Sequence, residues 1–272
     1  MVNFRAKRLG QYFLADKKFL DKLIEAADLK NDDVVLEIGA GTGILTLEIA
    51  KYVSKVIAIE KDSSFLETWN IKRETYPNVE FIIADALKIL PDLCFKLHDS
   101  RFKIIGNIPY YITGRLLRIL GELENKPSLI ILTMQKEVAE RICSSPPRMN
   151  LLAACIQFWA KPEVVACVPR GAFRPHPEVD SAVIRLIPDN KLEADISEKY
   201  FKVVKAGFRQ PRKLLINNLW TRGVDIFKNV GSKIKLTGTL RGLGIKENAR
   251  PQDLGIEEWK NLARKIMGVQ LP

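Results

Sequence analysis

The stretch VVLEIGAGTGILTLEIA, residues 34–50, joins a short apolar run to a glycine-rich turn and then to a segment with helical spacing. A short β-branched run of this kind is typical of a buried strand. Four more such runs follow, with room for a helix between them: KVIAIEK from 55, VEFIIAD from 79, FKIIGNI from 102 and SLIILTM from 128. The alternation predicts βαβ units, and strands this uniformly apolar predict a mostly parallel sheet with helices on both faces.

The chain changes character toward its C-terminus. PEVVACVP from 162 and DSAVIRLIP from 180 are separated by too few residues for a crossover helix, so they predict an antiparallel hairpin at the end of the sheet. After Pro188 the sequence becomes lysine-rich and helix-patterned, with no further strong strand. We therefore predict an α/β domain over residues 1–188 and a small all-helical domain over residues 189–272.

Composition excludes several classes of protein. With 272 residues and 47% hydrophobic content, the chain can bury an ordinary core. It has no apolar run near the roughly 18 residues that cross a bilayer, and its basic N-terminus lacks an apolar signal segment. We expect a cytoplasmic monomer without membrane contact. The four cysteines form no C-x-x-C pair and the chain has two histidines, so we expect no metal site and no disulfide framework.

The positive charge is concentrated in one part of the chain. Residues 1–169 carry 23 Lys and Arg against 21 Asp and Glu, whereas residues 170–272 carry 20 against 11. Most of the net charge of +11 therefore lies in the C-terminal third. A surplus of this size suits a polyanion such as nucleic acid, and the alternative is a merely soluble basic surface.

The glycines of the opening stretch indicate the kind of ligand. Gly39, Gly41 and Gly43 have the spacing G-x-G-x-G, whereas a dinucleotide fold needs a further glycine at the position that Ile44 occupies. The pattern argues against NAD. It resembles motif I of class I S-adenosylmethionine-dependent methyltransferases, in which the backbone of this loop approaches the methionine and ribose of the cofactor. A bare strand-to-helix turn is the alternative.

Carboxylates at the next two strand ends favour a nucleoside pocket. Glu60 ends VIAIE, where a carboxylate can accept hydrogen bonds from both ribose hydroxyls. Asp85 follows FIIA, where it can accept from the exocyclic amine of an adenine. Each residue alone could be a helix N-cap. Because the carboxyl ends of parallel strands meet at one edge of the sheet, the glycine loop and both carboxylates together predict a nucleoside pocket, and the resemblance to motif I implies S-adenosylmethionine as its ligand.

The fourth strand delivers NIPYYITG, residues 107–114, to the same edge. The Asn107 side-chain oxygen and the Ile108 carbonyl can accept from the amine of a base, and Pro109 fixes where that carbonyl points. Tyr110 can stack on the face of the base and so align its amine with the methyl donor. Such a base must be single-stranded or flipped out of a helix, and the basic C-terminal third supplies a surface for the nucleic acid.

With these residues in view, the chain resembles the KsgA/RsmA-type ribosomal RNA small subunit adenine dimethyltransferase family. The resemblance runs nearly end to end. It is carried by RLGQYFLAD, EIGAGTG, IEKD, ADAL, NIPYYIT, MQKEVAERI, VPRGAFRPHPEVDSAVIRL, FRQPRKLLINNL and LGIKENARPQDL. The last two blocks are the most specific, because they lie outside the methyltransferase core.

The resemblance implies roles for single residues. The expected cofactor-binding residues are Gln11, Tyr12, Leu14, Gly39, Gly41, Glu60, Asp85 and Asn107. The expected catalytic residues are Asn107 and Tyr110. Phe173 is similar to an aromatic residue that covers the other face of the target base, with a core Phe as the alternative. Arg209, Arg212 and Lys213 are expected to bind RNA phosphates, with a solvated charge cluster as the alternative.

The implied function is transfer of methyl groups from S-adenosylmethionine to N6 of two adjacent adenines near the 3′ end of small-subunit rRNA, within a partly assembled small ribosomal subunit. Tyr12 and Tyr111 stand where the family has Asn, and Ile108 stands where it has Leu. NIPY is frequent in the related Erm enzymes, which methylate large-subunit rRNA and confer macrolide resistance. A further alternative is a nucleic-acid-binding protein without turnover, like the mitochondrial transcription factors of this fold. The C-terminal blocks favour KsgA over Erm, and Glu60, Asp85 and NIPY favour an enzyme.

Overall fold

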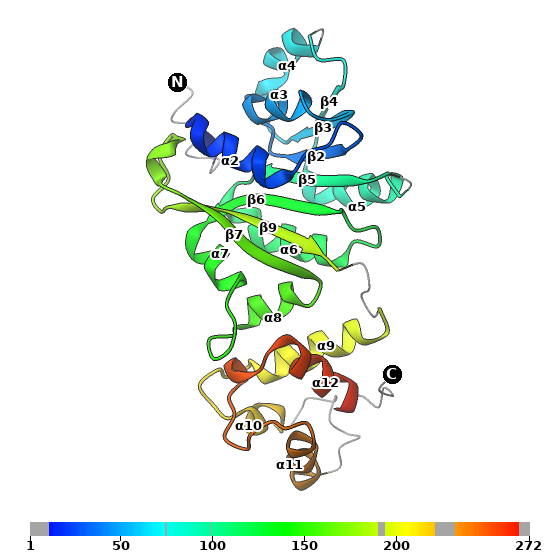
Figure 1. The fold of residues 1–272 in the computed structure, drawn as a ribbon, viewed down its shortest axis with the longest axis vertical. Helices are drawn as coiled ribbons and strands as arrows, with labels where there is room; N and C mark the ends of the chain where they lie inside the picture. The colour runs from blue at the N-terminus through cyan, green and yellow to red at the C-terminus, as the bar shows by residue number, and fades with distance from the viewer. Residues whose placement is uncertain (1–10, 74, 99, 190–193, 221–231, 267–272) are drawn as a thin grey trace. The chain divides into compact units, whose positions relative to one another are not determined.

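The computed structural model describes residues 11–73, 75–98, 100–189, 194–220 and 232–266. Two compact units make up the chain (Figure 1): residues 1–140 with 161–188, and residues 141–160 with 189–272. The second unit thus includes a segment that precedes Pro188 in the chain. A border between separate folding domains at Pro188 stays a prediction.

The first unit is built on a seven-stranded sheet with the strand order β4-β3-β2-β5-β6-β9-β7. Its strands are β2 (Val34–Ile38), β3 (Lys55–Glu60), β4 (Val79–Ile83), β5 (Phe102–Asn107), β6 (Leu129–Gln135), β7 (Ala160–Val168) and β9 (Ser181–Pro188). The five strands from β2 to β6 pair in parallel, and β9 pairs antiparallel to β6. This arrangement confirms the predicted fold class.

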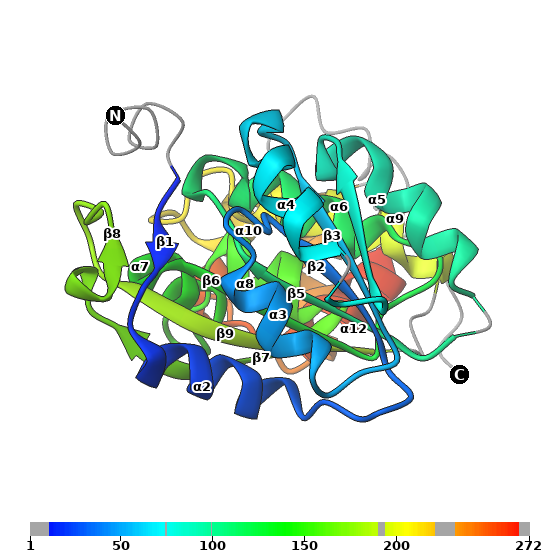
Figure 2. The ribbon, with the colours of Figure 1, turned by 90° about the horizontal axis from the view of Figure 1, so that it is seen from above.

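Helices cover both faces of the sheet (Figure 2). α2 (Lys17–Ala27) and α3 (Ile44–Ala50) lie on one face, and α5 (Ala86–Lys96) and α6 (Thr113–Glu122) lie on the other. Val35 and Leu36 of β2 point to opposite faces and are both fully buried. A strand buried on both faces is mostly apolar, and this is the sequence pattern that predicts the parallel sheet.

A short pairing outside the main sheet ties the N-terminal segment to the chain after β7. β1 (Phe13–Leu14) pairs antiparallel with β8 (Phe173–Arg174), and the Ala15 amide donates to the Ala172 carbonyl at 2.9 Å. The sequence does not predict this pairing, because two-residue strands carry no periodicity.

The second unit is helical in the parts that the structure describes. Its helices are α8 (Leu151–Gln157), α9 (Ala194–Gly207), α10 (Leu215–Leu219), α11 (Lys233–Gly242) and α12 (Ile256–Ile266). Trp259 of α12 and Tyr200 of α9 are fully buried, and the Tyr200 hydroxyl donates to the Ala154 carbonyl at 2.9 Å. At Gly207 a Cβ would lie 2.4 Å from the Trp259 ring, so glycine permits the close packing of α9 and α12.

No helix within the described ranges is long and apolar enough to cross a membrane.

Candidate functional site

A cavity of about 560 Å³ opens at the carboxyl ends of β2, β3, β4 and β5. This volume is in the range of small-molecule sites. The cavity brings together six of the residues predicted to bind the cofactor: Gln11, Tyr12, Gly39, Glu60, Asp85 and Asn107. Leu14 is buried beside it and lines a smaller neighbouring cavity with Gly39 and Asn107.

The glycine loop lies close to its neighbours at the positions where its glycines lack a Cβ. Gly39, Gly41 and Gly43 have φ values of 80°, 50° and 80°, in the left-handed region that favours glycine. At Gly41 a Cβ would lie 2.8 Å from the Phe13 ring, and at Gly39 it would lie 3.3 Å from the Asn107 carbonyl oxygen. The N-terminal segment and the NIPY loop can therefore pack directly against the backbone of the glycine loop.

Glu60 is held in one orientation by backbone amides. It is 5% exposed, and its Oε2 accepts from the Gly41 N–H at 2.9 Å. Its Oε1 accepts from the N–H groups of Lys61 at 2.7 Å and Asp62 at 2.8 Å. Three N–H donors fix the orientation of the carboxyl group. A carboxylate has about four lone-pair positions, so capacity remains to accept from a ligand hydroxyl.

Asp85 serves two neighbours at once. Its Oδ1 accepts from the Leu87 N–H at 3.1 Å and so caps α5, and its Oδ2 accepts from the Lys61 ammonium at 3.0 Å. Burial alone would raise the pKa of Asp85, but the hydrogen bonds from Lys61 and Leu87 outweigh it and lower that pKa. Asp85 therefore caps helix α5 and lines the cavity at the same time.

Asn107 is oriented from the N-terminal segment. Its Nδ2 donates to the Tyr12 backbone carbonyl at 2.7 Å, and a carbonyl can pair only with the NH₂ side of the amide. The opposite side of the amide, Oδ1, forms no hydrogen bond to another described residue. Asn107 thus presents an acceptor at the edge of the cavity.

Tyr110 lies in the turn η2 (Tyr110–Ile112) directly after the NIP residues. Its hydroxyl forms a 2.6 Å hydrogen bond with the Ser181 hydroxyl, and its ring lies beside the Tyr12 ring with centroids 5.4 Å apart. Burial raises the pKa of Tyr110, so the phenol stays neutral at physiological pH. Tyr111 is 68% exposed at the rim of the cavity.

Beneath the glycine loop lies a carboxyl group that the sequence analysis did not single out. Glu37 of β2 is 1% exposed, and neither of its oxygens has a hydrogen-bond partner at standard geometry among the described residues. Burial raises the pKa of Glu37 to about 8, with a small opposing effect from the nearby Thr46 hydroxyl. Glu37 is therefore largely protonated near neutral pH.

Phe173 is not an open stacking face, contrary to the prediction for it. It is 1% exposed and belongs to the hydrophobic core of the first unit, where its strand pairs with β1. The core alternative is the one that the structure supports. Arg209, Arg212 and Lys213 lie in the turn between α9 and α10, and all three side chains are exposed.

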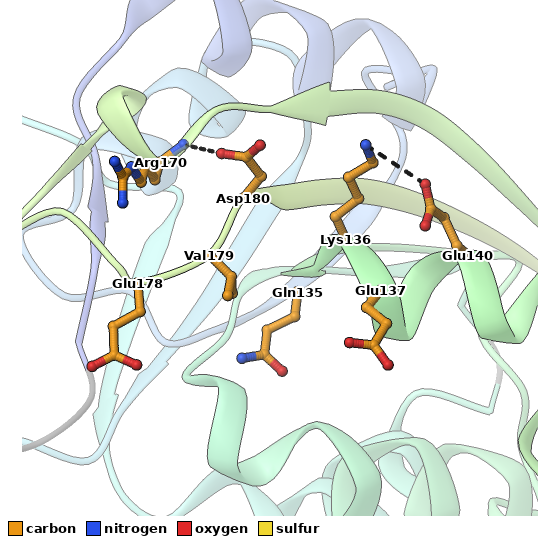
Figure 3. Close-up of a pocket in the computed structure, with 8 residues that line it drawn as sticks. All are labelled: Gln135, Lys136, Glu137, Glu140, Arg170, Glu178, Val179 and Asp180. Carbon is orange, nitrogen blue, oxygen red and sulfur yellow. Dashed lines mark hydrogen bonds and ion pairs between the residues drawn. The ribbon is translucent and has the colours of Figure 1, made fainter.

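A second cavity of about 480 Å³ lies at the ends of β6 and β9 (Figure 3). It is lined by Gln135, Lys136, Glu137, Glu140, Arg170, Glu178, Val179 and Asp180. The Asp180 carboxylate accepts from the Arg170 backbone N–H at 2.9 Å. Four carboxylates against two cations make this surface unfavourable for a phosphate. No group of three or more His, Cys, Asp or Glu in the described ranges is arranged to hold a metal ion.

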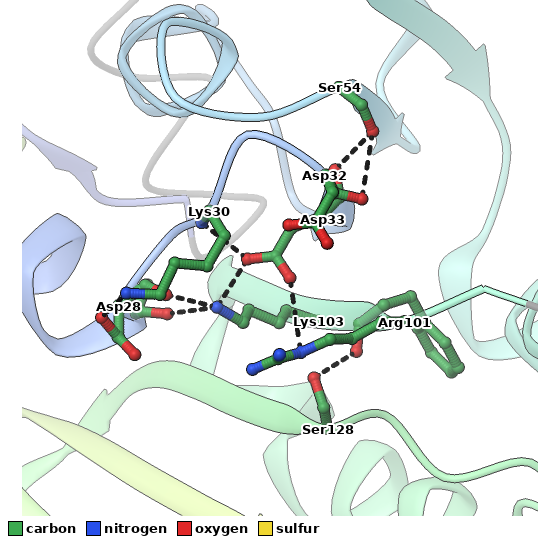
Figure 4. Close-up of polar contacts among 10 residues, drawn as sticks. Asp28, Lys30, Asp32, Asp33, Ser54, Arg101, Lys103 and Ser128 are labelled. Carbon is green, nitrogen blue, oxygen red and sulfur yellow. Dashed lines mark hydrogen bonds and ion pairs between the residues drawn. The ribbon is translucent and has the colours of Figure 1, made fainter.

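A buried ion pair fixes the opposite ends of β2 and β5 (Figure 4). The Lys103 ammonium lies 2.6 Å from Asp33 Oδ2, and the two side chains are 2% and 0% exposed. Lys103 also donates to the backbone carbonyls of Ala27 at 3.0 Å and Asp28 at 2.5 Å, at the end of α2. Because Lys103 and Asn107 share one strand, this anchor fixes where Asn107 stands relative to the glycine loop.

Three contacts at the cavity are absent from the sequence-based predictions. Lys61 pairs with Asp85, Phe13 packs on Gly41, and the indole of Trp69 donates to the Gly41 carbonyl at 3.1 Å. The position of Lys61 directly after Glu60 was a signal that it would lie at the sheet edge. Phe13 and Trp69 gave no such signal, because their contacts join segments distant in the chain.

The comparisons with known proteins cover nearly all of the chain. A family model described as ribosomal RNA adenine dimethylase matches residues 2–264. A ribosomal RNA small subunit methyltransferase A from Dehalococcoides mccartyi is 39% identical over 264 residues, which are 96% of this chain and 88% of the relative.

Two solved structures share the fold and more than a quarter of the aligned residues. A dimethyladenosine transferase from Plasmodium falciparum has a TM-score of 0.80 at 26% identity, covering 94% of this chain and 98% of that one. The 23S rRNA methyltransferase ErmE has a TM-score of 0.73 at 26% identity, covering 93% and 99%. These similarities include the C-terminal helices as well as the sheet.

Proposed function

Because the chain belongs to the ribosomal RNA adenine dimethylase family, we propose that it transfers methyl groups from S-adenosylmethionine to N6 of two adjacent adenines near the 3′ end of small-subunit rRNA. The product is N6,N6-dimethyladenosine. The protein acts as a cytoplasmic monomer on a partly assembled small ribosomal subunit. The observation that carries the proposal is the convergence of Glu60, Asp85 and Asn107 on one cavity, together with Gly39 of the glycine loop.

The cavity fits the cofactor by the chemistry of its donors and acceptors. Glu60 accepts from the ribose hydroxyls, because its carboxylate is already oriented by three backbone amides. Asp85 accepts from the adenine amine beside its ion pair with Lys61. Gly39 and Gly41 let the backbone approach the methionine part. When bound, the cofactor supplies an electrophilic methyl group on a sulfonium.

The residues of the NIPY loop orient the target amine. Asn107 Oδ1 and the Ile108 carbonyl accept from its two N–H groups, which favours a pyramidal nitrogen with an available lone pair. Tyr110 offers an aromatic face, and its hydrogen bond to Ser181 fixes the ring. A neutral amide at position 107 accepts a hydrogen bond without adding charge near Asp85. The second methyl transfer loses one N–H, and water can satisfy the released acceptor at small cost.

The RNA is held by charge in the C-terminal third. Arg209, Arg212 and Lys213 are exposed and form no ion pair with another described residue, so they are available for phosphates. The small-subunit substrate is supported by the relative at 39% identity, which is named for the small subunit. The alternative is large-subunit rRNA, which is favoured by the likeness to ErmE at 26% identity.

The deciding experiment uses labelled S-adenosylmethionine and two RNA substrates. The purified protein is incubated with undermethylated small ribosomal subunits and, separately, with naked large-subunit rRNA, and the modified adenines are mapped. We expect label at two neighbouring adenines of the small subunit. Label confined to large-subunit rRNA would establish the Erm-type activity, and RNA binding without label would establish a binding protein.

A further inference from the structure

A buried tryptophan contacts the middle of the glycine loop from a helix in which its neighbours at positions 66–68 and 70 are exposed. Trp69 belongs to α4 (Leu66–Arg73) and is 3% exposed, whereas Leu66, Glu67, Thr68 and Asn70 of the same helix are exposed. Its Nε1 donates to the Gly41 carbonyl at 3.1 Å. Trp69 therefore connects α4 to the glycine loop, whose backbone we expect to contact the cofactor.

Gly41 is constrained on three sides by this contact and two others. Its N–H donates to Glu60 Oε2 at 2.9 Å, and its carbonyl accepts from Trp69. The Phe13 ring occupies the place where a side chain would begin, 2.8 Å from an ideal Cβ. The peptide groups on both sides of Gly41 are thus held, one by Glu60 and one by Trp69.

The indole ring is itself fixed in place. It stacks on Phe81, the middle residue of β4, with centroids 4.2 Å apart and an angle of 18° between the planes. Trp69 and Phe81 also line a small cavity, together with the mostly apolar side chains of Leu47, Tyr76 and Val79. An indole N–H in apolar surroundings needs a hydrogen-bond acceptor, and the fixed ring directs it at the Gly41 carbonyl.

We infer that Trp69 is a positioning residue for the cofactor: it sets the backbone of Gly41 and, through the Gly41 N–H, the orientation of the Glu60 carboxylate. Trp69 does not line the cavity that holds Glu60 and Asp85, so its effect passes through the loop. The inference rests on the proposed cofactor. The side chain has two separate roles: its ring stabilises the fold by stacking on Phe81, and its N–H holds the Gly41 carbonyl in place.

The test compares two substitutions that remove these roles one at a time. Trp69→Phe keeps an aromatic ring on Phe81 and removes the N–H. Phe81→Leu removes the stacking partner and keeps the indole. We expect Trp69→Phe to weaken S-adenosylhomocysteine binding about three- to tenfold in calorimetry, the usual effect of one hydrogen bond. The KM for S-adenosylmethionine should rise by a similar factor, with kcat at saturating cofactor and RNA affinity unchanged.

Phe81→Leu should lower the thermal unfolding temperature and weaken S-adenosylhomocysteine binding less than Trp69→Phe does, because a leucine still covers one face of the indole and the N–H keeps its acceptor. Equal affinity of Trp69→Phe and wild type, or an equal loss in both variants, would show that Trp69 only packs. Absence of binding by the wild-type protein would instead refute the proposed cofactor.

A measurement on the wild-type protein covers the case that Trp69→Phe does not fold. The indole N–H resonance of Trp69 can be assigned by replacing the other three tryptophans one at a time. We expect it to shift when S-adenosylhomocysteine is added, because its acceptor is the Gly41 carbonyl. A resonance that does not move on saturation would contradict the inference.

Discussion

The edge of the sheet in the first unit and the basic turn between α9 and α10 use polar residues in opposite ways. At the sheet edge Glu60 and Asn107 each have backbone partners that fix their orientation. In the turn Arg209 and Arg212 are exposed and make no ion pair with another described residue. The first region is built for geometry and the second for charge. Changes at the first should affect rate and stability, whereas changes at the second should affect affinity in a salt-dependent way.

The largest effect should come from the anchor behind the sheet edge. Lys103→Ala removes the buried partner of Asp33, which is 0% exposed and then keeps, among the described residues, only the Lys30 N–H at 2.8 Å and the Arg101 guanidinium at 3.7 Å, so the fold should lose about 3–5 kcal/mol in urea unfolding. The paired change Asp33→Asn with Lys103→Met removes both charges and should recover most of this loss. Equal destabilisation by the single and the double variant would show that the ion pair matters only through its shape.

Glu37 should make the first unit less stable as pH rises. Its pKa in the folded state is raised to about 8 from 4.5, so between these values the folded state holds a proton that the unfolded state has lost. The free energy of unfolding therefore falls as pH rises, by about 3 kcal/mol from pH 5 to pH 8. The decrease ends above the pKa that Glu37 has in the folded state. Urea unfolding of Glu37→Gln over the same range should lack this slope. A wild-type stability that increases across the range would contradict the assignment.

The predicted catalytic contact should show itself in rate. Asn107→Ala removes the acceptor that we place on the target amine and should raise the barrier to methyl transfer by about 2–3 kcal/mol, while RNA binding changes little. Asn125→Ala is a matched control, because Asn125 also donates its amide to a backbone carbonyl, that of Cys94 at 2.7 Å, away from the cavity. Single-turnover kinetics with saturating RNA separate the two. Equal losses in affinity and rate would assign Asn107 to folding or binding.

Local patterns in the sequence were sufficient for the parallel strands and for the sheet edge. The strands β2 to β6 are mostly apolar runs, and Glu60, Asp85 and Asn107 each stand at or just after the end of one, so topology alone brings them together. What failed was non-local. Phe173 follows a turn, and a sequence cannot tell whether such an aromatic faces solvent or the core. The contact of Asn107 with the Tyr12 carbonyl depends on the β1–β8 pairing, whose two-residue strands leave no signal.

The smallest effect per residue should come from the basic turn, and it should depend on salt. The logarithm of the affinity falls linearly with the logarithm of the salt concentration. Each phosphate that the protein no longer neutralises reduces the magnitude of this slope by roughly 0.7–0.9. The triple variant Arg209→Gln, Arg212→Gln and Lys213→Gln should therefore reduce it by about 2.

A control of equal charge change is offered by residues already in ion pairs. Lys30→Gln, Lys51→Gln and Arg118→Gln remove cations that pair with Asp28, Glu48 and Glu122 in the first unit. If only net charge attracts the RNA, both triple variants will show the same slope, measured by titration with labelled RNA at several salt concentrations. If the turn binds phosphates directly, the slope will fall in the first variant alone and S-adenosylhomocysteine affinity will be unchanged in both. That outcome would separate a surface that binds through charge at defined positions from one that is merely basic.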